Sequence, residues 1–235
     1  LSNGCLFTIT GGDTADPDDG FAVTNDGGIP FWDFYQTKSV QSVGWPISQR
    51  WTNGPFTLQA FQKVILQWSP GDNRFNWLNT LDILHNDFGV DLDNVPPHRT
   101  LPADDGASFS RVVDNHLALL DQNPKIKAAF LAESDWLNLF GLPINYEERE
   151  VSGNPQGLQL LRSQRIVFEV WNVPAPGTSL GAVGRQNVPD KVKLDKKLSN
   201  VIIPDAARSP VTAAQAGGPV AEAPPAPGPV ATPAP

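Results

Sequence analysis

Residues 44–68 read GWPISQRWTNGPFTLQAFQKVILQW, and this stretch decides the fold that we predict for the chain. Its first three residues, Gly-Trp-Pro, are typical of a tight turn. A second turn is expected at residues 53–55, Asn-Gly-Pro, because Asn and Gly adopt the backbone angles that a hairpin tip needs. The stretch therefore predicts a hairpin whose strand ends at Trp68.

The end of this stretch alternates as a strand with one buried face does. Val64, Leu66 and Trp68 point to one side of an extended chain, whereas Lys63 and Gln67 point to the other. We therefore expect the apolar side to pack on a core and the polar side to face solvent.

A degenerate copy of this plan follows at residues 141–171, GLPINYEEREVSGNPQGLQLLRSQRIVFEVW. The two Gly-x-Pro-Ile sequences lie 97 positions apart, and four strand residues between 62 and 66 match residues 102 positions later. A longer hairpin tip absorbs the difference. Because the offset of 102 is the same for all four pairs, the matched strand residues keep their alternation in phase. The pattern predicts an internal duplication.

Segments with a helical period lie between the two hairpins and before the first. Apolar residues recur every three or four positions in residues 31–35, 78–84, 109–120 and 126–130. The fold class predicted is α+β, with two related subdomains that each combine helices and a small antiparallel hairpin sheet. Runs of strands and helices without strict alternation fit that class.

Three regions follow from these patterns. Residues 1–95 are predicted to form a first unit with an N-terminal extension, and residues 96–203 a second, degenerate unit. Residues 204–235 are almost entirely Ala, Pro, Gly and Val. Such a composition buries too little apolar surface to offset the entropy of ordering, so a disordered linker or tail is expected there.

Composition argues against two classes of partner. The net charge of −8 argues against a nucleic-acid partner, because a phosphate-binding surface needs clustered Lys and Arg. No apolar run approaches the roughly 18 residues that suggest a membrane span. Methionine is absent, even at position 1. A processed chain whose leader has been removed would explain this, so we expect an extracellular or cell-surface protein.

An acidic loop near the start is a candidate calcium site. Asp13, Asp16, Asp18 and Asp19 offer the carboxylate oxygens that Ca²⁺ prefers. The loop lacks the alternate-position pattern and the closing Glu of an EF-hand. The alternative is a solvated Asp/Pro/Gly turn. No other cofactor is expected.

Tryptophan carries the clearest binding signal. Trp45 at the first turn and Trp51 before the hairpin tip are expected to be partly exposed, and Arg50 could stack beside them. Exposed indole planes suit the C–H faces of sugar rings, so these three residues form a predicted glycan site. The alternative for any tryptophan is core packing, which we expect of Trp68 and Trp136.

Catalytic motifs are absent from the sequence. The three histidines, His85, His98 and His116, are each expected to be packed or solvated rather than catalytic. Glycoside hydrolysis needs two carboxyl groups that can be distant in sequence. A cluster such as Glu147 and Glu148 at the second hairpin tip is more simply a solvated face.

Three stretches carry a resemblance to a known family: residues 43–48, VGWPIS; residues 59–68, QAFQKVILQW; and parts of residues 116–171, among them GLPINYE and RSQRIVFEVW. Through them the chain resembles extracellular modules of bacterial surface proteins related to LGFP repeats, over about residues 28–205. The resemblance implies a secreted or surface location and association with the cell envelope. It implies no reaction and no catalytic residues.

The sequence therefore predicts a non-catalytic extracellular module. Its expected partner is a cell-wall or other extracellular polysaccharide, or a protein of a surface assembly. The alternative is an exported, glycan-cleaving hydrolase with a site built from scattered Asp and Glu. Two carboxyl groups about 5–10 Å apart in a groove would favour that enzyme.

Overall fold

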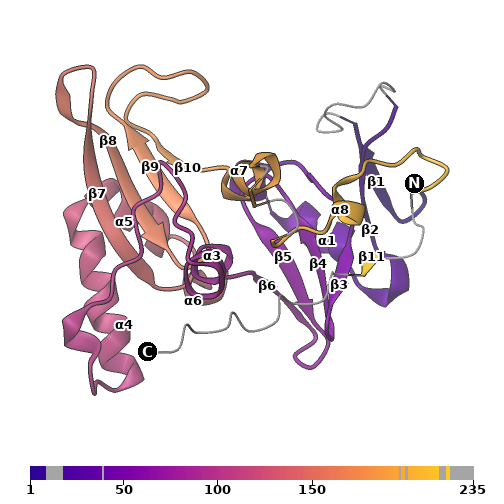
Figure 1. Cartoon of the computed structure of the whole chain (residues 1–235), viewed down its shortest axis with the longest axis horizontal. Helices are drawn as coiled ribbons and strands as arrows, with labels where there is room; N and C mark the ends of the chain where they lie inside the picture. Colours follow the sequence, from indigo (N-terminus) through magenta and orange to yellow (C-terminus); the bar gives the residue numbers. More distant parts are fainter. Residues whose placement is uncertain (9–17, 39, 196, 199–200, 217–220, 223–235) are drawn as a thin grey trace, which may run out of the picture.

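The chain has an α+β architecture, as the sequence predicts (Figure 1). The structure is a computed structural model, and it describes residues 1–8, 18–38, 40–195, 197–198, 201–216 and 221–222. The strands are β1 Gly4–Phe7, β2 Phe21–Thr24, β3 Trp51–Asn53, β4 Phe56–Ala60, β5 Ile65–Ser69, β6 Arg74–Trp77, β7 Pro143–Val151, β8 Asn154–Ser163, β9 Val167–Trp171, β10 Val183–Arg185 and β11 Ala221–Glu222. The α-helices are α1 Phe31–Thr37, α2 Val40–Val43, α3 Thr80–Phe88, α4 Phe109–Leu117, α5 Pro124–Leu131, α6 Trp136–Leu139, α7 Val188–Leu194 and α8 Asp205–Arg208, and the 3₁₀ turns are η1 Asp26–Gly28, η2 Pro102–Asp104 and η3 Ala118–Gln122.

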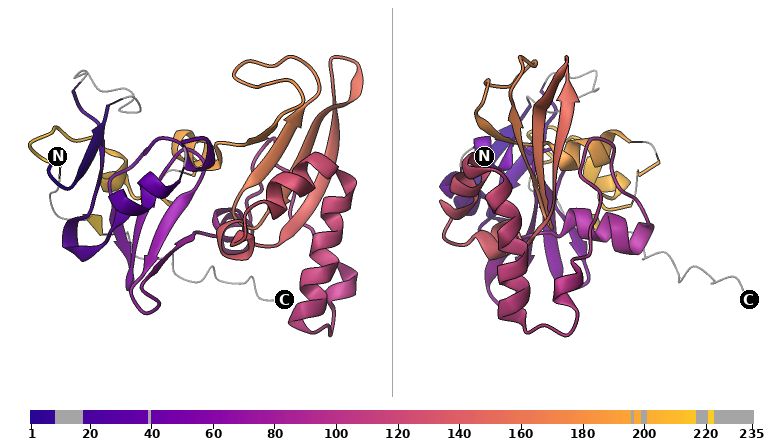
Figure 2. Two further views of the ribbon diagram at one scale, coloured as in Figure 1. Left: turned by 180° about the vertical axis from the view of Figure 1, so that it is seen from behind. Right: turned by 90° about the vertical axis from the view of Figure 1, so that its left-hand side faces the viewer.

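Two antiparallel sheets of the same strand order dominate the molecule (Figures 1 and 2). The first sheet has the order β3-β4-β5-β6, with β11 added in parallel beside β3. The second has the order β7-β8-β9-β10. A separate hairpin pairs β1 with β2. Short α-helices precede each four-strand meander and another helix follows it, so the two units share one sequence of elements.

Each Gly-x-Pro turn docks on a glutamine in the same way. The backbone N–H of Trp45 donates to Gln62 Oε1 at 3.1 Å, and that of Leu142 donates to Gln164 Oε1 at 2.8 Å. The backbone N–H of each glutamine bonds in return to the carbonyl oxygen of the same turn residue. These equal contacts support the internal duplication, which remains a prediction.

The glycine of each turn is required by the backbone. Gly44 has φ +82° and Gly141 has φ +73°, values that side chains with a Cβ rarely adopt. A Cβ added at Gly44 would also lie 2.6 Å from Gln62 Cβ, and one added at Gly141 would lie 2.7 Å from Gln164 Cβ. The turn therefore approaches the sheet too closely for any other residue.

The segment that follows each sheet packs on the other unit. Leu81 and Leu84 of α3, which follows the first sheet, lie in a core cluster with Leu160 of the second sheet. Ile203, which follows the second unit, lies in a cluster with Leu58 of the first sheet. The two units thus exchange their C-terminal segments, and the predicted boundary at residues 95–96 does not separate them in space. Figure 1 shows α3 and α7 between the two sheets.

Both faces of the first sheet are buried, which corrects the expectation of one buried face. Leu66 faces the largest cluster, which contains residues from both units. Ile65 points the other way and is only 1% exposed, because the C-terminal segment covers that face. The C-terminal segment covers the second face of the sheet. The alternation of residues 63–68 contains no sign of this cover.

The predicted helices form, with one error on their inner faces. Asn123 accepts hydrogen bonds from the backbone of Lys125 and Ile126 and so caps α5, whose Ile126 and Phe130 are buried. Phe109, predicted on the apolar face of α4, is 66% exposed. It occupies the first turn of its helix, beyond the reach of the second sheet. Figures 1 and 2 show α4 and α5 along one face of that sheet.

The first part of the predicted tail is folded. Residues 204–216 fold onto the first unit, where Ala207 is fully buried and Val211 forms a bridge with Gly20. Strand β11 pairs with β3. The linker prediction is therefore wrong for residues 204–216, because the first sheet needs them as cover. Residues 217–220 and 223–235 lie outside the described part of the chain.

Within the described ranges, no helix has both the length and the apolar character needed to cross a bilayer.

Candidate functional site

The predicted glycan site does not assemble, because Trp51 is a core residue. Its side chain is 1% exposed and packs with Leu58 and Ile47 under the C-terminal segment. The expectation that Trp51 lies near the rim is therefore wrong. Its position in β3 turns the ring to the face that the exchanged segment covers.

Arg50 and Trp45 contact different parts of the structure. Arg50 is buried, donates to the backbone oxygen and the carboxylate of Asp26, and lies over the ring of Phe31. Trp45 is half-buried, with its ring 5.6 Å from that of Phe7. Only Trp45 retains the partial exposure predicted for it, so the three residues do not form one surface.

The acidic loop is only partly within the described residues. Asp13 and Asp16 lie outside them, whereas Asp18 is exposed and Asp19 is half-buried. Among the residues that the structure describes, no group of three or more His, Cys, Asp or Glu side chains could hold a metal ion. Calcium binding at Asp13, Asp16, Asp18 and Asp19 stays a prediction.

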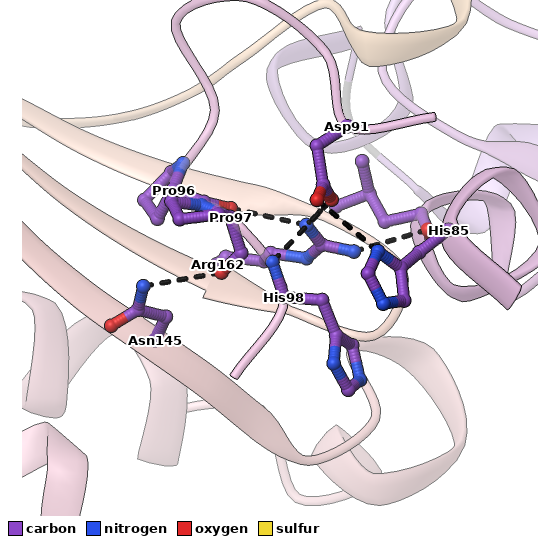
Figure 3. A network of polar contacts seen from close by, with 8 residues as sticks. His85, Asp91, Pro96, Pro97, His98, Asn145 and Arg162 are labelled. Carbon is purple, nitrogen blue, oxygen red and sulfur yellow. Dashed lines mark hydrogen bonds and ion pairs between the residues drawn. The ribbon is translucent and has the colours of Figure 1, made fainter. Parts of the chain in front are cut away.

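The histidines serve structural contacts. His116 is buried, and its ring nitrogens face the carbonyl oxygen of Pro143 and the carboxylate of Asp104. His85 and His98 stack with their ring centroids 4.4 Å apart. Figure 3 shows this pair beside Asp91.

Arg162 is the centre of the network in Figure 3. It is 1% exposed, and it donates to Asp91 Oδ1 at 2.6 Å and to the carbonyl oxygens of Pro96 and Leu81. His85 Nδ1 lies 3.1 Å from the other carboxylate oxygen of Asp91. The network fixes the exchanged segment of the first unit onto strand β8 of the second, so we assign it to the fold.

A cavity of about 1050 Å³ lies between the two units. It opens along β10, the edge strand of the second sheet, and faces α2 of the first unit. A cavity of this volume can hold a ligand larger than one sugar ring. Its lining consists of Val40, Gln41, Ser42, Gln62, Lys63, Asn94, Ala129, Leu158, Phe168, Glu169, Trp171, Pro176, Gly177, Thr178, Ser179, Ala182, Val183, Gly184, Arg185, Gln186, Asn187 and Lys191.

Three cations and one carboxylate are the charged groups of this lining. Lys63, Arg185 and Lys191 are each about half-exposed or less, and Glu169 lies among them. Burial lowers the pKa of all three cations, and the charge of Arg185 lowers that of Lys63 further. None of the three comes within ion-pair distance of a carboxylate in the described residues. The cavity is therefore locally positive on a protein of net charge −8.

The interface that the predicted duplication makes equivalent differs from the one at the cavity. Between β6 and α6, at the place that the predicted repeat makes equivalent, Arg74 Nη2 donates to Asn138 Oδ1 at 2.6 Å. The residues that the repeat places at those positions are Ala182 and Gln41, and both line the cavity. Strands β5 and β6 are joined by four residues, whereas eleven residues, 172–182, join β9 and β10. A side-chain hydrogen bond thus bridges one of the two interfaces, and the cavity lies at the other.

Sequence analysis missed this site because its residues are distant in the chain. Lys63 and Arg185 lie 122 positions apart, and each stands in an ordinary strand context. One signal was present: the repeat aligns Lys63 with Arg165, so a cation follows the docking glutamine in both units.

No family model, no curated protein and no solved structure matches the chain. The resemblance to modules related to LGFP repeats therefore rests on the sequence stretches alone.

Proposed function

We propose that this chain is a non-catalytic binding module of the cell surface and that it holds an envelope polysaccharide in the inter-unit cavity. The observation that carries the proposal is the asymmetry of the two equivalent interfaces. One interface has a side-chain hydrogen bond between Arg74 and Asn138, whereas the other has the small side chain of Ala182 and a longer loop, and the cavity lies there. Packing normally fills such a space, so an open one favours a ligand.

The lining suits a saccharide. Trp171 provides partly exposed aromatic surface, and the exposed side chains of Gln41 and Asn94 provide amide donors and acceptors. Convergent polar groups on a partly apolar wall are what small-molecule sites share.

The lining supports binding better than hydrolysis. A glycosidase needs two carboxyl groups that flank the bond. Among the described lining residues, Glu169 is the one carboxylate. The charged cluster Glu147 and Glu148 is used within the second sheet, where Glu147 pairs with Arg149 and Glu148 accepts from Gln156.

A blocking variant tests the proposal. Ala182→Trp places a large ring in the cavity mouth, and Ala213→Trp places the same ring on an exposed site outside the lining. We expect purified cell walls or their polysaccharides to pull down the unmodified chain and Ala213→Trp, and Ala182→Trp to lose at least about tenfold in affinity (about 1.4 kcal/mol) with unchanged thermal unfolding.

Two results would overturn the proposal. Ala182→Trp that binds walls as well as Ala213→Trp does would show that the cavity is not the site. Release of new reducing ends from the bound polysaccharide would show that the module is catalytic.

A further inference from the structure

We propose that Lys63 and Arg185 form an anion subsite, which binds a carboxylate or phosphate group of the ligand. The inference rests on the proposed function and names the chemical class of its ligand. It starts from the placement of two cations at one wall of the cavity, with no carboxylate of the described residues within ion-pair distance of either.

Both cations are held in place by the same short helix. Lys63 Nζ donates to the carbonyl oxygen of Gln41 at 2.8 Å, and Arg185 Nη1 donates to that of Ser42 at 3.3 Å. These are consecutive residues of α2. The two charged groups therefore lie at neighbouring carbonyl groups. Each has further N–H donors, and no hydrogen bond from these donors is seen among the described residues.

Arg185 is further fixed by aromatic rings. Its guanidinium lies 4.8 Å from the ring centroid of Phe140 and 5.5 Å from that of Phe168. Such stacking leaves the edge of the planar group to form hydrogen bonds, and that edge fits an oxyanion. The subsite is thus preorganised before any ligand arrives.

The two cations repel each other, and a carboxylate offsets this for each of them: Glu169 for Lys63, and Glu133, which lies outside the lining, for Arg185. Lys63 feels the charge of Arg185 as well as that of Glu169, and Glu169 also acts on Lys191. Partly buried charges without a counter-ion at ion-pair distance are costly, so an anion that bridges Lys63 and Arg185 would be stabilising.

The interface between β6 and α6 has a cation at the position that corresponds to Lys63. Its equivalent of Lys63 is Arg165, which donates to the carbonyl oxygens of Leu137 and Asn138. Burial lowers the pKa of Arg165, and the charges of Asp82 and Asp135 oppose this. At the cavity Glu169 acts on Lys63 and Glu133 acts on Arg185, but the two cations also face each other. We infer that an anion of the ligand binds between them.

The test compares matched ligands by titration calorimetry with the whole chain at low salt. The probes are an oligogalacturonate, its uncharged methyl ester, and glycerol phosphate. Lys63→Gln removes one cation of the subsite. Lys127→Gln removes an exposed cation on α5 outside the lining and changes the net charge equally. Arg185→Lys keeps the positive charge and removes the planar guanidinium group. Its thermal unfolding should match that of the unmodified chain.

We expect an acidic probe to bind at least tenfold tighter than the methyl ester, and Lys63→Gln to remove most of that preference while Lys127→Gln retains it. Arg185→Lys should weaken the acidic probe in the same direction. Binding of the oligogalacturonate alone identifies carboxylate as the group, and binding of glycerol phosphate identifies phosphate.

The other outcomes separate the two proposals. If acid and ester bind equally, or if Lys63→Gln matches Lys127→Gln, the anion subsite is wrong and the binding function stands. If cell walls bind but no acidic probe does, the subsite is again wrong. If neither walls nor probes bind, the proposed function fails and the subsite fails with it.

Discussion

Whether a tryptophan of this chain is buried depends on neighbours that are distant in the sequence. Trp45 and Trp51 look alike in sequence, since each stands beside a turn. In the structure Trp51 is enclosed by the exchanged C-terminal segment, whereas Trp45 keeps part of its ring in solvent. The difference lies in residues about 150 positions away, so no local pattern could report it.

At this scale we predict that Trp51→Ala lowers the free energy of unfolding by about 3–5 kcal/mol, the usual cost of removing a buried aromatic side chain. Trp45→Ala should cost clearly less, because its ring is half-buried. Urea unfolding followed by circular dichroism measures both. Equal losses for the two variants would mean that Trp51 does not lie in the core.

The repeated element of this chain is the turn and the glutamine beneath it. Gly44 and Gly141 combine positive φ with close contact to Gln62 and Gln164, and the same two backbone hydrogen bonds close each turn. The Gly-x-Pro sequence thus encodes a docking contact, and the glutamine about 20 residues later completes it.

We predict that Gly44→Ala and Gly141→Ala each destabilise the protein by more than Gly54→Ala does. Gly54 has φ +57° and open space around its Cβ position, so its variant pays only the conformational cost of about 1–2 kcal/mol. The two turn variants add a clash with a glutamine Cβ. Thermal unfolding of the three variants gives their order of stability. If Gly54→Ala is as unstable as the two turn variants, the steric clash with the glutamine contributes nothing.

The whole molecule depends on contacts between its units, and one of them should respond to pH. Burial and the charge of His85 lower the pKa of His98 below 6.5. For Asp91, burial raises the pKa, but the hydrogen bond and charge of Arg162 outweigh it and hold the pKa below 3.8. Both groups bind a proton more readily in the unfolded chain.

We therefore predict that stability is full above about pH 6.5 and falls as the pH decreases through the lowered pKa of His98, with a second fall below about pH 4 from Asp91. His98→Gln should flatten the first fall and leave the second. Melting temperatures between pH 3 and pH 8 check this. A first fall that persists unchanged in His98→Gln would assign it to another group.

Local sequence determined much of this protein. The α+β class, the hairpin tip at residues 53–55, the helix α5 with its Asn123 cap and the two Gly-x-Pro turns follow from turn chemistry, period and capping, which act over a few residues. The strand predicted to end at Trp68 is instead divided into β4 and β5. The matching strands also predicted two sheets, which the structure has in the same strand order.

Only the tertiary structure decided what covers the sheets and where the cavity lies. The exchange of C-terminal segments buries both Trp51 and Ile65 and draws residues 204–216 into the fold. The cavity needs Lys63, Arg185 and Lys191 to meet across two units, together with a long loop after β9. Such contacts depend on which surfaces bury most area when the whole chain packs, and the spacing of residues along one strand or helix carries no record of them.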